Sequence, residues 1–482
     1  NDTKKAKEVY TYNNNLLQSV TKYDNINVGW IKETYTYDEN LQGVGNITKK
    51  VTTNSIDSQI ITVQDKYDTS GRFVIKKTDN LGLETNYTYN NWGQVLTQTD
   101  TFGNTITNFY DYWGKLLSSS NNLNGTTTYG YDKFSTGNPV LGIMGVSGTQ
   151  VTENLPDGDV NVVFTNTLGQ KYKTITKSSN QNSYVAKELA FDAIGRQVGE
   201  SEPYLTTNIS GDNNSVNSST WNTITYDDSV FPPKVTAQMF NNGKKMETTV
   251  SGNTVTVKEV NGYGRTTSKT SDPLGNVSSS TDAGGTISFT YNAIGQNLTA
   301  TYEGNVVRTS YDVWGRKSLF TDPANGTYTY EYTGFGDIKK ETSPKGKKQY
   351  TYKPNGLLET ITEVSDDGTS TNKSITLAYN TKWQLISKSG TSLGKSYQHT
   401  YDYYIDGRLK TDIENSNNIQ FYNSNISYDS FGKIKRYDKG LISDGVTTSV
   451  AIENVYNTWD GSLYQLKQEG TGKILSEIQS VN

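Results

Sequence analysis

The chain has 482 residues, a formal net charge of −4 with acidic and basic residues interspersed, and no cysteine. This charge balance argues against nucleic-acid binding, which favours basic patches, and the lack of thiols excludes disulfides and thiolate metal sites within the sequence. Only 32% of the residues are hydrophobic, but 35 tyrosines supply large rings that can be buried while their hydroxyl groups stay hydrated or find a partner.

Residues 1–50 carry a loose pattern in which tyrosines recur two residues apart, as in Tyr10 and Tyr12. From residue 67 to 134 the pattern becomes regular, and glycine returns every ten or eleven residues within polar clusters that are typical of turns. Between these clusters, side chains alternate with period two, which predicts strands. Such short connections leave no room for a parallel crossover, so the strands should pair antiparallel with their neighbours.

Residues 136–162 interrupt the rhythm, and we expect a longer connection or a bend there. Residues 201–233 form an irregular insert with a polar stretch flanked by prolines, which predicts a surface loop. The regular period returns over residues 261–364, and weaker copies run to the end. We therefore expect residues 1–482 to form one continuous all-β body without a transmembrane segment, and to be part of a longer chain.

The repeating unit begins with Tyr-Asp and reaches Gly-Arg after two further residues. The aspartate is predicted to cap the turn by accepting backbone N–H groups, and the arginine to pair with neighbouring acids along the sheet. The tyrosine is expected to pack on the residue before the turn glycine, namely Trp92, Phe102, Trp113, Ile194, Ile294, Trp314 or Phe335. The residues that define the turns are Tyr67, Asp68, Gly71, Arg72, Gly93, Gly114, Gly295, Tyr311, Asp312, Trp314, Gly315, Arg316, Gly336 and Gly356.

Candidate catalytic groups are few. His399 is the only histidine and lies in an alternating stretch, which favours a strand residue over a catalytic base because no matched nucleophile and acid accompany it. The aspartates of the repeats recur too often to form one active site. No acidic cluster has the spacing of a known calcium loop. The sequence therefore predicts no catalytic residue, no cofactor and no metal.

The segments YDVWGR, YDTSGR, FDAIGR and YDYYIDGR resemble the tyrosine-aspartate (YD) repeats of the Rhs family, which includes bacterial wall-associated toxins, the C components of insecticidal toxin complexes and teneurins. The resemblance implies a long antiparallel ribbon of β-hairpins that spirals into a hollow shell. Strand twist favours the same shape, since a long meander cannot stay flat and coiling hides its edges. The family's self-cleavage site resembles DPxGL, but Asp272-Pro273-Leu274-Gly275 lies inside a regular repeat and is interpreted as an ordinary turn.

The resemblance also implies a function. It indicates a structural, non-enzymatic shell within a secreted or surface-displayed bacterial protein. The implied partners of this shell are a C-terminal effector domain of the same polypeptide and the secretion machinery of the outer membrane. Two alternatives stay open: an adhesin that binds glycans or another cell, and a secretion-machine substrate in transit. A polysaccharide-cleaving enzyme is disfavoured because no pair of carboxylates stands out from the repeats.

Overall fold

The computed structural model describes residues 7–38, 45–135, 146–179, 182–210, 220–240 and 243–477. These residues form 40 β-strands and no α-helix, from β1 (Glu8–Asn13) to β40 (Ile474–Glu477). Each strand pairs antiparallel with its successor from β1 to β15 (Tyr184–Phe191), and again from β18 (Trp221–Asp227) to β40. The predicted all-β antiparallel ribbon is confirmed.

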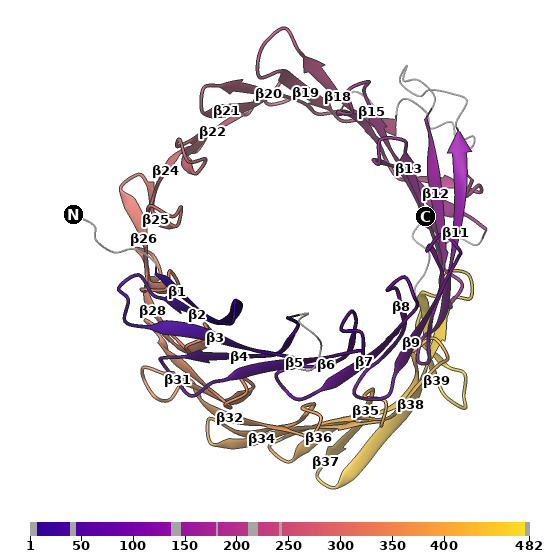
Figure 1. Ribbon diagram of the computed structural model, residues 1–482, viewed down its shortest axis with the longest axis vertical. Helices are drawn as coiled ribbons and strands as arrows, with labels where there is room; N and C mark the ends of the chain where they lie inside the picture. Colours follow the sequence, from indigo (N-terminus) through magenta and orange to yellow (C-terminus); the bar gives the residue numbers. More distant parts are fainter. Residues whose placement is uncertain are drawn as a thin grey trace.

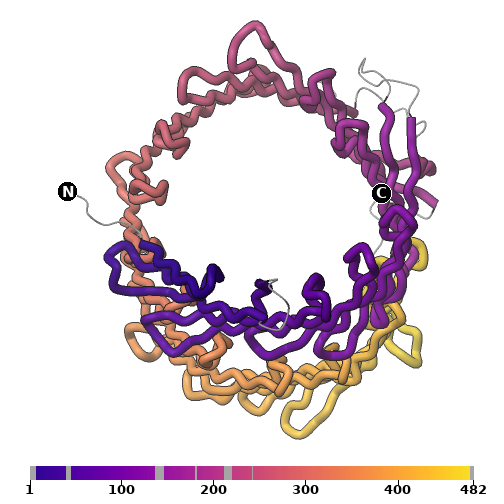
Figure 2. Tube along the Cα trace, in the orientation of Figure 1, coloured from indigo at the N-terminus to yellow at the C-terminus, as the bar shows by residue number. Residues whose placement is uncertain are grey.

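The ribbon winds around an open centre (Figure 1). Its strands cross the ribbon, and the chain advances from one hairpin to the next around the ring. The N-terminal part then lies beside the orange and yellow C-terminal part, so the ribbon is a spiral of more than one circuit (Figure 2). We call β1 to β25 (Asn297–Tyr302) the first coil, and β26 (Asn305–Tyr311) to β40 the second coil.

The ribbon has two edges, each made of hairpin turns. The edge that carries the Tyr-Asp motifs, with turns such as 68–73, 111–115 and 312–316, is called the YD edge. The opposite edge, with turns such as 79–83 and 323–325, is called the return edge. Because each strand runs from one edge to the other, side chains placed at the turns can reach beyond the sheet.

The faces of the wall show the predicted alternation. In β28 (Gly326–Tyr332), Tyr328, Tyr330 and Tyr332 are half-buried, while the threonines and the glutamate between them are exposed. Since the wall is one sheet thick, its tyrosine face gains burial from neighbouring strands and not from a second layer. Large rings suit this position because they cover much area and keep their hydroxyl groups at the surface.

A compact core occurs where the repeat is interrupted. Phe134, Val162, Phe164, Ile175 and Ala186 form a buried cluster. The expected long connection at 136–162 instead contains β12 (Ser147–Asn154) and the start of β13 (Val160–Asn166), while residues 136–145 lie outside the described part. Strands form here because Val160, Val162 and Phe164 alternate toward this cluster.

The predicted surface loop at 201–233 is likewise wrong for part of its length. β17 (Tyr204–Thr206) and β18 lie within it, and residues 211–219 lie outside the described part. β16 (Gln197–Ser201) and β17 both pair with β15, so the chain continues the sheet across Pro203. Burial of Trp221, which is 3% exposed, explains why this polar segment holds a strand.

Candidate functional site

Each YD turn is built on the side chain of its acidic or amide residue. Asp312 Oδ1 accepts the backbone N–H groups of Trp314 and Arg316, each at 2.9 Å. The Gly315 N–H donates to the Asp312 carbonyl at 3.0 Å, and the Asp312 N–H donates to the Arg316 carbonyl at 2.7 Å. Gly315 has φ of +78°, where a Cβ would be strained. Five residues thus reverse the chain and satisfy their own polar groups.

The other predicted turn residues repeat this geometry with variations. Asp68 Oδ1 accepts the N–H groups of Arg72 at 2.8 Å and Phe73 at 3.2 Å. Positive φ angles recur at the glycines Gly71, Gly93, Gly114, Gly295, Gly336 and Gly356. Asn90 takes the place of aspartate in the turn that ends at Gly93, and its Oδ1 accepts the N–H groups of Trp92 and Gln94, each at 3.0 Å. An uncharged oxygen can therefore accept the same two bonds as a carboxylate.

The arginines follow the prediction at one turn and depart from it at others. Arg196 donates to both carboxylate oxygens of Asp228, in the turn after β18, at 2.7 and 3.0 Å, as predicted. Arg316 Nε donates to Asp312 Oδ2 at 2.7 Å, so its carboxylate partner belongs to its own turn and not to an adjacent strand. Arg316 also donates to the Thr333 carbonyl at 2.8 Å, which ties one YD turn to the next. The Arg72 guanidinium lies over the Phe73 ring, 4.9 Å from its centroid. The arginines therefore stiffen the turns locally.

The tyrosine at the end of a strand that enters a YD turn commonly bonds to the preceding repeat. Tyr332 donates its hydroxyl to the Lys317 carbonyl at 2.6 Å, and Tyr311 donates to the Asn297 carbonyl at 2.9 Å. Lys317 lies opposite Tyr311 at a β-bulge, where the regular ladder shifts register. Equivalent bonds start from Tyr37, Tyr67, Tyr89, Tyr110, Tyr131, Tyr226, Tyr291, Tyr352, Tyr379, Tyr403, Tyr428 and Tyr456.

The expected packing of this tyrosine on the residue before the turn glycine is wrong for four of the seven residues named. Trp92 and Trp113 are both 84% exposed, and Ile194 and Ile294 are similarly exposed. These residues occupy the tip of the turn, which projects past the sheet edge and away from the ring faces. A residue after the glycine packs instead: the Phe73 ring stacks on Tyr89 with centroids 5.0 Å apart.

The two coils meet along a seam in which the return edge of the first coil contacts the YD edge of the second. The Asn25 N–H donates to the Val313 carbonyl at 3.1 Å. Asn80 Nδ2 donates to the Asn355 carbonyl at 2.7 Å, across 275 residues of sequence. In these two bonds the YD turn offers a carbonyl group and the return turn supplies the donor.

Further along the seam, Trp383 stands where other YD turns have glycine, with φ of +59°. Its indole N–H donates to the Leu81 carbonyl at 2.6 Å, a bond across the seam that can offset this backbone strain. Asn104 Nδ2 donates to the Asp406 carbonyl at 2.9 Å, across 302 residues. The seam therefore extends over several consecutive turns.

Charged groups close the far end of the seam. Lys433 Nζ contacts Asp157 Oδ2 at 2.5 Å, and Lys177 Nζ lies 3.9 Å from the centre of the Trp459 ring. Burial alone would raise the pKa of Asp157, but the bond from Lys433 and backbone amides outweigh it and hold the pKa below its ordinary value. Burial raises the pKa of neighbouring Asp159.

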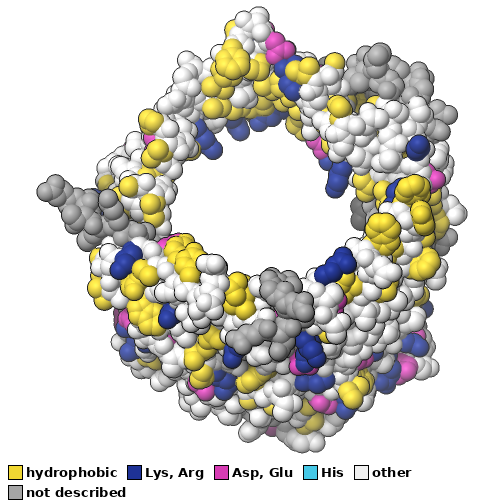
Figure 3. All heavy atoms as spheres, viewed as in Figure 1, with side chains coloured by type: hydrophobic (Ala, Val, Ile, Leu, Met, Phe, Trp, Pro, Cys, Tyr) yellow, Lys and Arg dark blue, Asp and Glu magenta, His cyan; other side chains and the backbone are white. Residues whose placement is uncertain are grey.

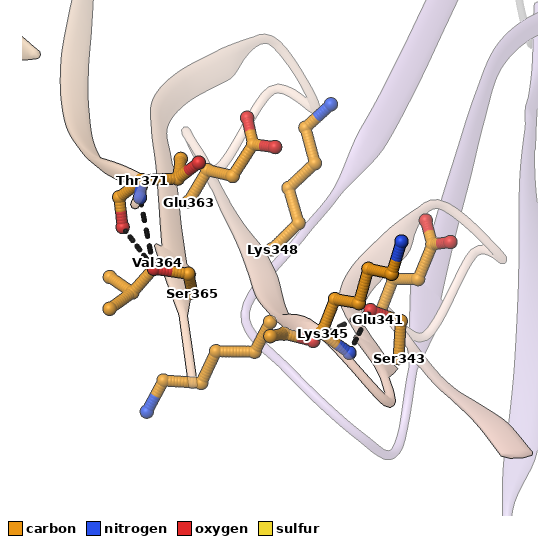
Figure 4. Close-up of a pocket in the computed structure, with 10 residues that line it drawn as sticks. Glu341, Ser343, Lys345, Lys348, Glu363, Val364, Ser365 and Thr371 are labelled. Carbon is orange, nitrogen blue, oxygen red and sulfur yellow. Dashed lines mark hydrogen bonds between the residues drawn. The ribbon is translucent and has the colours of Figure 1, made fainter. Parts of the chain in front are cut away.

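Hollows lie between adjacent turns of the return edge. One, of about 420 Å³, lies at the seam between Gly125 and Pro156, and Phe431 of the second coil lines it. Another, of about 320 Å³, lies at the return edge of the second coil between turns 343–346 and 365–371 (Figure 4). Lysines and glutamates both line this second hollow, among them Lys345, Lys348, Glu341 and Glu363, so its lining carries both signs of charge.

No catalytic arrangement emerges around the predicted candidates. His399 stacks on Tyr401, with ring centroids 4.4 Å apart, and its Nε2 contacts Asp412 on the next strand. Asp272 Oδ1 accepts the N–H groups of Leu274 and Asn276, as in any YD turn. Within the described ranges, no cluster of histidine and acidic side chains could hold a metal ion, and no helix is long and apolar enough to cross a membrane.

Comparisons with known proteins agree with this geometry. The Rhs-repeat family model matches residues 67–105, and no curated protein matches the sequence. The TcdB2-TccC3 complex is similar in structure, with a TM-score of 0.53 and 12% identity over 98% of this chain and 36% of that one. The Photorhabdus luminescens Tc holotoxin pore aligns over 96% of this chain and 34% of its own, at 11% identity and a TM-score of 0.40.

This chain therefore spans about a third of the length of the solved chains that it matches. At 12% identity, the likeness to TcdB2-TccC3 shows a shared fold. The family match covers the first regular repeats, and the same turn geometry recurs from Asp68 to Asp429. Residues 67–105 therefore carry an Rhs repeat, and the described ribbon as a whole shares the fold of the TcdB2-TccC3 structure.

Proposed function

We propose that this coil is part of a shell that encloses a C-terminal effector domain of its own polypeptide, in a secreted or surface-displayed bacterial protein. The observation that carries the proposal is the open centre of the ring, which is surrounded by a wall one sheet thick (Figure 3). A container needs an enclosed volume and a continuous boundary, and it needs no reactive group. The described residues supply a wall around an open centre, which supports this proposal (Figure 1, Figure 3).

The protection would be steric. Neighbouring strands in a sheet lie about 4.8 Å apart, so a hydrogen-bonded wall excludes polypeptides and proteases. Between coils, the boundary depends on the seam and not on the sheet. Contacts such as Asn80 with Asn355 and Lys433 with Asp157 close what would otherwise be a slit in the wall. The integrity of the seam should therefore determine how well an enclosed domain is protected.

This proposal is tested on the full-length polypeptide. Lys433→Met removes the contacts of Lys433 Nζ with Asp157 and with the Gly461 carbonyl. Lys410→Met is the matched control, since Lys410 forms an exposed ion pair with Asp402 on the wall. We expect limited proteolysis to degrade the C-terminal domain faster in Lys433→Met than in the wild type or in the control. Deletion of residues 1–482 should abolish protection, and a domain that stays equally resistant would overturn the proposal.

Export and the adhesin alternative require separate measurements. If the protein is displayed on the cell surface, protease added to intact cells should cleave it, whereas a cytosolic control protein should survive. A glycan array probed with residues 1–482 addresses the adhesin alternative, because a container should show no specific binding. Specific glycan binding together with an unprotected C-terminal domain would replace the container by an adhesin.

A further inference from the structure

The two coils are held together by separate hydrogen bonds and not by a ladder of strands. β4 (Ile47–Asn54) pairs with β3 (Trp30–Tyr37) and β5 (Ile61–Tyr67), which are its neighbours in sequence. In the second coil, β29 (Ile338–Ser343) likewise pairs with β28 and β30 (Gly346–Tyr352). Among these described strands, no pairing joins one group to the other. The seam can therefore open while both ribbons keep their backbone ladders.

One connection of the first coil contacts the second coil at two places. Residues 55–60 join β4 to β5 at the return edge, and we call them the seam loop. The Ile60 N–H donates to the Pro354 carbonyl at 3.0 Å, and the Gly334 N–H donates to Asp57 Oδ2 at 2.7 Å. The seam loop therefore lies against two successive YD turns of the second coil, those that follow β28 and β30.

The seam loop is bonded to itself and can move as one piece. Asn54 Oδ1 accepts the N–H groups of Ile56 at 2.8 Å and Asp57 at 2.9 Å. Asp57 Oδ1 accepts the Gln59 N–H at 3.0 Å, and Asn54 Nδ2 donates to the same oxygen at 2.9 Å. None of these four bonds reaches the second coil, so the loop keeps them when it moves away.

Gln59 lies between the two residues that bond across the seam, and its side chain is buried without a partner. The residue is 6% exposed, and neither Nε2 nor Oε1 makes a hydrogen bond. Among the described residues, it is the only amide side chain with both polar atoms in this state. Asn80 and Asn104, by contrast, donate to carbonyl groups of YD turns across the seam. A buried amide without hydrogen bonds destabilises the closed seam, because it has given up its bonds to water.

We propose that the seam loop is a gate in the wall. It swings away from the second coil, exposes Gln59 to water and opens a slit between the coils while the two ribbons stay folded. Opening costs the two bonds at Ile60 and Gly334 but restores the hydration of Gln59, so this part of the seam opens most readily. The use of the gate rests on the proposed function: the slit is a path by which an extended segment of an enclosed domain leaves the shell.

Hydrogen exchange of the full-length polypeptide, read by mass spectrometry of its peptides, tests the gate. Gln59→Leu replaces the unpartnered amide by an apolar side chain of similar size, so the amides of Ile60 and Gly334 should exchange about tenfold more slowly, which corresponds to about 1.4 kcal/mol. Gln59→Glu buries a carboxylate beside Asp57 and should make both amides exchange at least about tenfold faster at neutral pH. Gln64→Leu is the matched control, because Gln64 is exposed on β5, and it should leave both rates unchanged.

Unchanged exchange in folded Gln59→Leu would overturn the gate. Faster exchange in that variant would also overturn it, by showing that water or another group stabilises the amide in the closed state. Circular dichroism identifies a variant that has lost its fold, and Gln59→Met, with a more flexible apolar side chain, then takes the place of Gln59→Leu. Protease resistance of the C-terminal domain is a separate readout, which should rise in Gln59→Leu and fall in Gln59→Glu. If exchange shifts as expected and resistance does not, the loop opens as inferred and the container function is refuted.

Discussion

Replacement of Asp312 by alanine tests whether one side chain holds a repeat turn together. The change removes the acceptor of two backbone N–H groups and of Arg316 Nε. Loss of a comparable side-chain cap at a helix start costs about 0.5–2 kcal/mol, and a partly exposed ion pair adds up to about 1 kcal/mol. We therefore expect Asp312→Ala to destabilise its turn by about 2 kcal/mol. Asp312→Asn keeps Oδ1 as an acceptor and should cost only about 0.5 kcal/mol.

Native-state hydrogen exchange measures this effect at the turn itself. A loss of about 2 kcal/mol corresponds to roughly 30-fold faster exchange of the Trp314 and Arg316 amides. The Asn25 N–H should also exchange faster, because it donates to the Val313 carbonyl of the same turn across the seam. Asp111→Ala provides the matched control: its turn has the same cap but lies on the YD edge of the first coil, outside the seam, so the effect should stay local.

Two outcomes would refute this reasoning. Amides of Trp314 and Arg316 that exchange at the wild-type rate in Asp312→Ala would show that the backbone holds the turn without the side chain. Faster exchange at Asn25 in Asp111→Ala as well as in Asp312→Ala would show that the effect spreads through the sheet and not across the seam. The Asp312→Asn variant separates the hydrogen bonds from the charge, because it removes the negative charge and keeps the oxygen that accepts the N–H groups.

Three further experiments test a tyrosine hydrogen bond, a buried ion pair and the pH dependence of the seam. Tyr332→Phe removes one bond to a bulge carbonyl and should cost about 1 kcal/mol in urea denaturation; no loss would mean that water replaces the hydroxyl. Glu188→Gln disrupts a buried ion pair and should cost about 3 kcal/mol, while Glu200→Gln, in an exposed pair, should cost under about 0.5 kcal/mol. The pKa of Asp157 is lowered in the folded state, so the charged carboxylate stabilises the fold fully above about pH 4. This stabilisation is lost as the pH falls through the lowered pKa. The pKa of Asp159 is raised in the folded state, so its protonation at falling pH favours the folded state instead. Proteolysis across the acid range should show the seam opening, and Asp157→Asn should remove that pH dependence.

The sequence predicts those features of the fold that depend only on residues within about ten positions of one another. The turn at Asp312 needs only its own cap and Gly315, so composition and spacing reveal it. The bond from Tyr332 to Lys317 is harder to foresee, because its acceptor is left available at a β-bulge that no residue type marks. The exposure of Trp92 and Trp113 could not be predicted either. Alternation assigns the residues of a strand to its two faces, but it does not say in which direction the tip of a turn projects.

The seam lies beyond such local rules. Asn80 and Asn355 are 275 residues apart, and nothing in either turn specifies the other. The same limit explains the error at 136–162, where the cluster around Phe164 forms from several strands and overrides the loss of rhythm. Contacts of this kind depend on the radius of the spiral, which results from the summed twist of many strands and not from any one of them.

A repeat protein must still choose one way to stack its coils. If all turns were alike, sliding one coil past the other by one hairpin would preserve every backbone contact of the seam, and the spiral could adopt several radii. The seam avoids this through residues that depart from the repeat: Trp383 in place of a turn glycine, and the charged contact of Lys433 with Asp157. A slip by one hairpin would remove the partners of both. The repeated residues therefore build the wall, while the exceptions fix its register and with it the size of the enclosed space.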